Sequence, residues 1–175
     1  MKKFIIFMTF ICAFVLSGCG GNLQGQPENY ITPDENMPDY TKNSVISEYM
    51  GDINSDGEDD TVSLYIDAEF DKDGTLMKNH SNRWSLCVLD GATKNVCTLY
   101  DETIQHGDLY FQIMDFFENK EVKTNIMVYK NSGAELKIKS YVFEKDKGFL
   151  DNTIYNSSDH SEGGINLRFS TVPEN

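Results

Sequence analysis

Short runs of apolar and β-branched residues follow one another from residue 44 onward, and each run is bounded by Gly, Asp or Asn. In the run 61–67, Val62, Leu64 and Ile66 alternate with Thr61, Ser63 and Tyr65, which is the two-residue period of a strand with one buried face. Few stretches have the length or spacing of an amphipathic helix. We therefore predict an all-β, mainly antiparallel domain over residues 44–175. The predicted strands cover residues 44–50, 61–67, 83–89, 96–100, 109–114, 123–130, 135–145 and 165–170.

The first residues have the pattern of an export signal. Lys2 and Lys3 precede an apolar run over residues 4–16, which is too short to span a bilayer and has the length of a signal-peptide core. The run ends in Leu-Ser-Gly-Cys at residues 16–19, which resembles the bacterial lipobox. The resemblance implies that residues 1–18 are a signal peptide and that Cys19 is acylated. An ordinary secretory signal or a signal-anchor helix are the other interpretations.

The lipidated cysteine implies a membrane partner and a location. We expect a lipid anchor at Cys19 in the cell membrane, with the protein on the extracytoplasmic side. Residues 19–43 are rich in Gly, Asn, Asp and Pro without sustained periodicity, so we predict a flexible tether there. The formal charge is −13, and loss of residues 1–18 removes two further lysines and no acid. Such an acidic chain disfavours nucleic acid as a partner, because that binding depends on Lys and Arg contacts to phosphate.

Two cysteines lie in the predicted domain. A hairpin centred on Ala92 would place Cys87 and Cys97 opposite each other, within reach of a disulfide, and an extracytoplasmic location permits oxidation. The other interpretation is two buried thiols that pack as small apolar side chains. The hairpin register decides between the disulfide and the two separate thiols. A shift of one residue would move one cysteine side chain to the other face of the sheet.

The segment Gly-Asp-Ile-Asn-Ser-Asp-Gly-Glu-Asp-Asp at 51–60 has the spacing of a calcium loop. Oxygen-bearing side chains stand at positions one, three, five and nine, Gly57 at six permits a sharp turn, and position seven usually supplies a carbonyl oxygen. Position twelve is Ser63, within a strand pattern, so an EF-hand is excluded and a strand–loop–strand site is favoured. We expect a structural Ca²⁺ ion, bound to ligands in the following set: Asp52, Asn54, Asp56, Glu58 and Asp60.

The segment 51–65 resembles the FG-GAP or VCBS-type repeats found in integrin alpha-chain propellers and in many bacterial surface proteins. The order of lipobox, tether, acidic loop, the segment 89–95 and the later segment 113–130 is similar to small lipoproteins of Gram-positive bacteria with paired repeats of this kind. The resemblance implies two blade-like sheets. It also implies a second, degenerate repeat over 109–130, where Asp115 keeps the first acid but Lys120 and Lys123 replace the glycine and the closing acid. We predict that this segment keeps the loop shape without a metal.

Two other groups of residues have more than one interpretation. The acidic segment 67–74 lacks good oxygen donors at the later ligand positions, so we predict an exposed connection between strands. The aromatic residues could form a carbohydrate or peptide surface, or they could form the core of a small β domain. The aromatic residues in question are Trp84, Tyr110, Phe111, Phe116 and Phe117.

The sequence contains none of the common catalytic motifs. It has no Gly-x-Ser-x-Gly, His-Glu-x-x-His or phosphate-binding glycine loop, and its three histidines, at positions 80, 106 and 160, are far apart. We therefore predict that the protein is not an enzyme. We expect a binding, adhesion or scaffold module of the cell envelope, with an unknown protein or glycan as its ligand. The alternative is an envelope-associated hydrolase or an accessory subunit of an enzyme.

Overall fold

The computed structural model describes residues 28–34, 44–118, 120–133 and 135–157. The predicted signal peptide, Cys19, His160 and the predicted strand at 165–170 lie outside these residues. Nine strands occur in the described ranges. They are β1 (Tyr30–Ile31), β2 (Ser44–Gly51), β3 (Asp60–Ile66), β4 (Ser81–Leu89), β5 (Val96–Gln105), β6 (Gly107–Glu118), β7 (Glu121–Ser132), β8 (Leu136–Glu144) and β9 (Gly148–Asn156).

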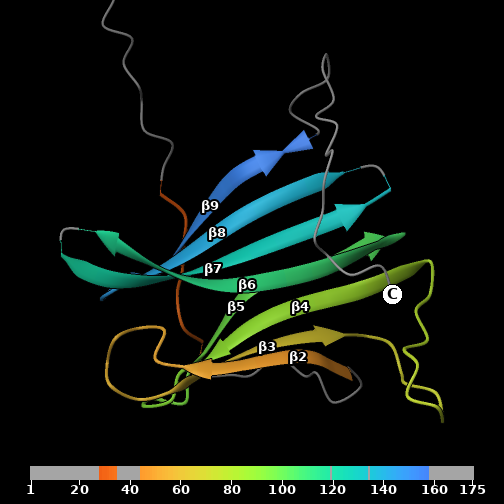
Figure 1. The fold of residues 1–175 in the computed structure, drawn as a ribbon, viewed down its shortest axis with the longest axis horizontal. Helices are drawn as coiled ribbons and strands as arrows, with labels where there is room; N and C mark the ends of the chain where they lie inside the picture. Colours follow the sequence, from red (N-terminus) through yellow and green to blue (C-terminus); the bar gives the residue numbers. More distant parts are fainter. Residues whose placement is uncertain (1–27, 35–43, 119, 134, 158–175) are drawn as a thin grey trace, which may run out of the picture.

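The strands form two antiparallel sheets, which confirms the prediction of an all-β, mainly antiparallel fold. One sheet has the order β2-β3-β4-β5, and the other has the order β1-β9-β8-β7-β6. Figure 1 shows the two sheets one above the other. Each sheet is a meander in which chain neighbours pair, apart from β1, which joins the edge of β9. Local hairpins therefore account for most of the topology.

One hydrophobic core joins the two sheets. Val62, Leu64 and Ile66 on β3 are almost fully buried, as their alternation predicts. They belong to the same cluster as Ile126 on β7 and Tyr141 on β8, so the second sheet covers the first. Burial of large apolar side chains supplies most of the favourable free energy of such a fold.

Part of the predicted tether belongs to the folded domain. Tyr30 and Ile31 pair with Leu150 and Phe149 of β9. Asp34 forms an isolated bridge with Val96, with backbone hydrogen bonds of 2.7 and 2.9 Å in the two directions. The chain thus runs along one side of both sheets before β2 begins, and it links their edges.

In the β4–β5 hairpin, Cys87 and Cys97 are buried and are not joined by a disulfide. Cys87 is opposite Thr98, while Cys97 is opposite Val88, because the ladder shifts register between Leu86 and Cys87. Adjacent positions of a strand point to opposite faces, so the two thiols lie on opposite sides of the sheet. Cys97 packs in the main core and Cys87 in a small cluster on the other face. The disulfide is therefore not formed, and burial raises the pKa of the Cys97 thiol to about 12.

The segment proposed as a degenerate second repeat does not keep a loop shape. Residues 107–118 and 121–132 pair without interruption, so that Asp115 is opposite Thr124 and Phe116 is opposite Lys123. Lys120, the residue before β7, has a φ of 73°. The predicted loop shape is therefore wrong, because residues that would curl into a loop form ladder pairs instead. The absence of a metal from this segment stays a prediction.

Candidate functional site

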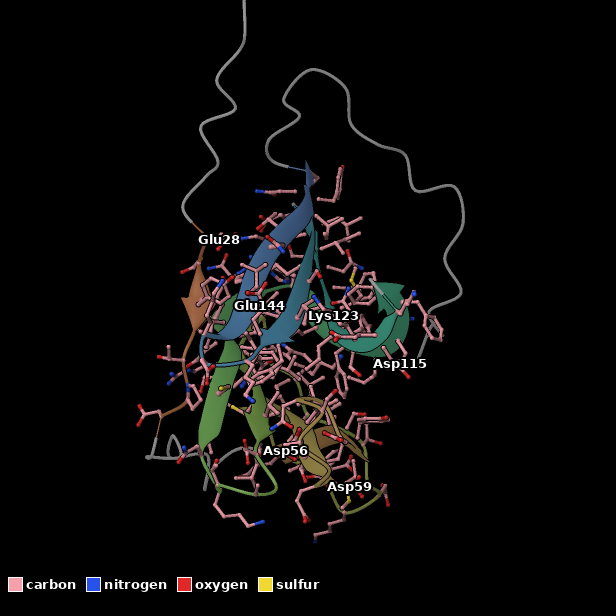
Figure 2. All side chains as sticks on the ribbon, turned by 90° about the vertical axis from the view of Figure 1, so that its left-hand side faces the viewer. Glu28, Asp56, Asp59, Asp115, Lys123 and Glu144 are labelled. Atoms are coloured by element: carbon pink, nitrogen blue, oxygen red, sulfur yellow. The ribbon has the colours of Figure 1, made fainter. Side chains whose placement is uncertain are left out.

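The acidic segment forms the connection between β2, which ends at Gly51, and β3, which begins at Asp60. Ser55 has a φ of 61° and Gly57 has a φ of 95°. Glycine adopts the second value readily, whereas residues with a Cβ atom rarely do. The sharp turn expected at Gly57 is thus present. Figure 2 shows Asp56 and Asp59 at one end of the molecule, below the sheet that carries Asp115 and Lys123.

Side chains inside the loop hold its turns by accepting backbone N–H groups. The two oxygens of Asp52 accept the N–H groups of Asp56 at 3.1 Å and of Gly57 at 3.0 Å. Asn54 Oδ1 accepts the N–H of Asp56 at 2.9 Å, and Asp56 Oδ1 accepts the N–H of Glu58 at 2.9 Å. These contacts form a series of overlapping side-chain turns. They fix the direction of the backbone from Asp52 to Glu58.

Asp60 closes the loop from inside the protein. Its side chain is 1% exposed, and its Oδ2 accepts the N–H groups of Ile53 at 3.0 Å and Asn54 at 3.3 Å. Its Oδ1 accepts the N–H of Gly91, at 2.9 Å, from the β4–β5 hairpin. Burial raises the pKa of this carboxyl group, although the three N–H groups oppose the shift. One buried carboxylate therefore joins the two connections at this end of the first sheet.

Asp90 also belongs to this group, and the spacing of the loop gave no sign of it. Asn54 Nδ2 donates to Asp56 Oδ2 and to Asp90 Oδ2, at 3.1 Å in both cases. Burial would raise the pKa of Asp90, but the N–H groups of Thr93 and Ala92, among other donors, hold it below its usual value. The only sequence signal was the Asp-Gly pair at 90–91, which is typical of a turn.

The chemistry of these residues fits calcium in part. The side chains provide hard oxygens in the expected order, and the glycine makes the expected bend. Each carboxylate oxygen of Asp52, Asp56 and Asp60 nevertheless already accepts an N–H group of the protein. Across the described ranges, no three Asp, Glu, His or Cys side chains are grouped so that they could hold a metal ion. The structure therefore has the shape of the loop without a converged ligand set, and calcium stays a prediction.

Among the described residues, His80, His106 and the second acidic connection share no site with this loop. His80 and His106 meet at the opposite end of β4, with ring centroids 4.9 Å apart. In the segment 67–74, Asp71 Oδ1 accepts the N–H groups of Asp73 and Thr75, which makes a tight turn. That segment is the connection between β3 and β4, as predicted.

The aromatic residues divide between the interior and the surface. Trp84 is only 2% exposed, and the half-buried Phe111 packs against the core. Tyr110 is also half-buried, but it is the adjacent residue of β6 and so faces the other side of the sheet. Phe117, by contrast, is 83% exposed near the end of the β6–β7 hairpin. It lies opposite Val122, which is 50% exposed. The aromatic residues are therefore neither all part of the core nor all part of an exposed binding surface.

Comparisons with known proteins give no relative of this chain: no family model matches it, and no curated protein or solved structure does. None of the described residues belongs to a helix long and apolar enough to cross a membrane.

Proposed function

We propose that this chain is a lipid-anchored binding module of the cell envelope, facing the extracytoplasmic side, with a protein or a glycan as its partner. The observation that carries the proposal is the exposed end of the β6–β7 hairpin. Phe117 and Val122 form a register pair, so their side chains share one face of the ladder, and both are exposed. Exposed aromatic side chains on a rigid strand pair are typical anchors for a partner surface or a sugar ring.

The hairpin is well suited to hold these side chains in place. Its two strands pair over twelve residues each, and Thr124 Oγ1 donates to Asp115 Oδ1 at 2.9 Å just behind the exposed pair. Asp115 and Thr124 pair two positions further along the same face of the ladder, so polar groups border the apolar pair. An apolar centre with a polar border is the usual arrangement of a recognition surface.

The anchor at Cys19 would hold this module at the membrane. We also propose that the two meander sheets are blade-like units related to the FG-GAP or VCBS-type repeats, and that the 51–60 loop binds a structural Ca²⁺ ion. The four-strand meander with an acidic connection after its first strand supports the first of these proposals. The order of oxygens in the loop and the positive φ at Gly57 support the second.

The anchor is tested by growing cells that express the full chain with an alkyne-labelled fatty acid. We expect label on the unmodified chain, in the membrane fraction, and none on the Cys19→Ser variant, which should be released from that fraction. Equal labelling of both chains would contradict acylation at Cys19.

The binding surface is tested with the mature chain and its Phe117→Ala variant. Both are sedimented with purified cell-wall polymer and, separately, are crosslinked to washed envelopes. We expect the variant to lose most of its binding, because a central aromatic anchor contributes strongly to recognition. Ile154→Ala is the matched control, since Ile154 is also exposed (60%) but lies on β9. Equal binding of Phe117→Ala and the control would refute the role of the hairpin.

A further inference from the structure

His80 and His106 meet at the point where the chain passes from one sheet to the other. His80 directly precedes β4, and His106 is the single residue between β5 of the first sheet and β6 of the second. Their ring centroids are 4.9 Å apart, and the ring planes are tilted by 48°. Both residues are exposed. Two histidines that are distant in the sequence thus place their imidazoles side by side at the surface.

Backbone contacts fix the position of both histidines. The N–H of His106 donates to the carbonyl oxygen of His80 at 2.9 Å, and the N–H of Gly133 donates to the carbonyl oxygen of His106 at 3.2 Å. His106 has a φ of 49°, in the left-handed region, which histidine adopts more often than most residues do. A Cβ atom at Gly107 would lie 2.2 Å from the carbonyl oxygen of Asn131, so the chain passes close to β7 here. The two rings are therefore attached to a fixed backbone.

The ring nitrogens of the two histidines have no competing partner among the described residues. No hydrogen bond or ion pair joins either ring to another residue of those ranges, so a nitrogen of each neutral imidazole can bind a ligand. Lys78, near His80 in sequence, forms an ion pair with Asp108, near His106, so its positive charge is neutralised. The formal charge of the chain is −13, which favours the approach of cations.

The separation of the rings matches that of two imidazoles bound to one metal ion. A histidine nitrogen binds Zn²⁺ at about 2.0–2.1 Å, which places the ring centroid roughly 3.2 Å from the ion. Two such rings have centroids roughly 4.5 Å apart at a right angle and roughly 5.2 Å apart at the tetrahedral angle. The observed 4.9 Å lies between these values. The tilt of 48° differs from the parallel and the edge-on arrangements that aromatic rings prefer when they only pack together.

We propose that His80 and His106 bind a divalent transition-metal ion, of the class of Zn²⁺, Ni²⁺ and Cu²⁺, through one nitrogen of each ring. Imidazole suits these ions, whereas Ca²⁺ prefers oxygen ligands such as those of the acidic loop. No third Asp, Glu, His or Cys of the described ranges joins the pair, so water completes the coordination. The site lies at the other end of β4 from Gly91 and at the other end of β6 from Phe117. It therefore depends on neither the calcium loop nor the partner surface proposed above.

The test titrates the mature protein with Zn²⁺ in a calorimeter, in the presence of excess Ca²⁺ to occupy oxygen sites. We expect one Zn²⁺ ion per chain. His80→Asn and His106→Asn should each weaken binding roughly tenfold or more, because each removes one of the two nitrogen ligands. Asparagine tolerates the left-handed φ at position 106, and circular dichroism checks that both variants are folded. His160→Asn is the matched control and should bind Zn²⁺ as the unmodified protein does.

Cu²⁺ identifies the ligands directly. Pulsed electron paramagnetic resonance of the protein with one equivalent of Cu²⁺ should detect two imidazole ligands, and one in His80→Asn or His106→Asn. Unchanged Zn²⁺ affinity in these two variants would overturn the proposal, and so would a Cu²⁺ signal without imidazole. An equal loss of affinity in His160→Asn, or one Zn²⁺ ion per two chains, would overturn a site formed by this pair within one chain.

Discussion

Replacement of Asp60 by alanine should destabilise the protein strongly. The carboxylate is buried and accepts three backbone N–H groups, from Ile53, Asn54 and Gly91. The variant leaves these donors without an acceptor, and each buried unsatisfied group costs about 1–3 kcal/mol. Asn54 is only partly buried and the costs are not fully additive, so we expect a loss of about 3–5 kcal/mol in the free energy of unfolding. For a domain of this size, that loss lowers the Tm by roughly 10 °C.

The assay is urea unfolding of the mature chain, followed by circular dichroism in EDTA. Asp59→Asn is the matched control, because Asp59 is the adjacent residue and its side chain is exposed. The control should change the free energy of unfolding by less than about 0.5 kcal/mol. If Asp60→Ala loses no more stability than this control, Asp60 does not join the two connections as described.

Thermal unfolding in calcium and in EDTA separates the two explanations of the loop. If an ion binds only the folded state, saturating Ca²⁺ raises the Tm of the unmodified protein, by an amount equivalent to about 2.7 kcal/mol at a concentration of 100 Kd. Asp52→Asn should then lose most of this increase, since Asp52 is at the first ligand position. Identical melting curves in calcium and EDTA would refute the metal and leave the hydrogen bonds as the whole explanation of the loop.

Three further predictions concern single residues. Tyr141→Phe should raise the free energy of unfolding by about 1 kcal/mol, because the buried hydroxyl has no hydrogen-bond partner among the described residues. Urea unfolding measures this change, and a loss of stability would contradict it. Gly91→Ala should cost about 2–4 kcal/mol, because the added Cβ would lie 2.1 Å from the carbonyl oxygen of Asp59, and a cost below 1 kcal/mol would contradict that close contact. Arg83 holds the pKa of Asp101 below its usual 3.8, so this pair stabilises the fold above that pH, and the contribution is lost as the pH falls through the lowered pKa. Arg83→Gln should therefore cost less than about 1 kcal/mol at pH 7, since Arg83 is largely exposed, and the difference from the unmodified protein should shrink as the pH falls below 3.8.

The strands were predictable where local pattern alone determines them. The alternation of Val62, Leu64 and Ile66 correctly gave the buried face of β3, because one side of that strand packs on the second sheet. Strand β9, by contrast, was not predicted. Its segment 148–156 has Asp, Asn and Thr among its apolar residues, and it is held by pairing with β8 and β1. Tertiary pairing of this kind overrides a weak local propensity.

The disulfide and the second repeat show the limits of spacing as evidence. An irregularity after Leu86 shifts the hairpin by a residue, and this small change sends Cys87 and Cys97 to opposite faces. Likewise, the alignment of Asp115 with Asp52 matches residue types only. The strand pairing around Asp115 requires only residues that fit a strand, so the match did not predict a loop. In both cases, the backbone pairing decided the outcome, and spacing does not specify it.

The acidic loop was predictable in its shape but not in its connections. Gly57 and the alternating oxygens of Asp52, Asn54 and Asp56 indicated a tight curl, because those turns form between residues close in sequence. The contact of Asp60 with Gly91 spans 31 positions, so no local pattern could reveal it. The same holds for a cavity between the two sheets, since residues of both form its wall and it exists only after they pack. Spacing therefore identifies candidate ligands within one loop, whereas the partners and cavities that decide their role depend on the packed fold.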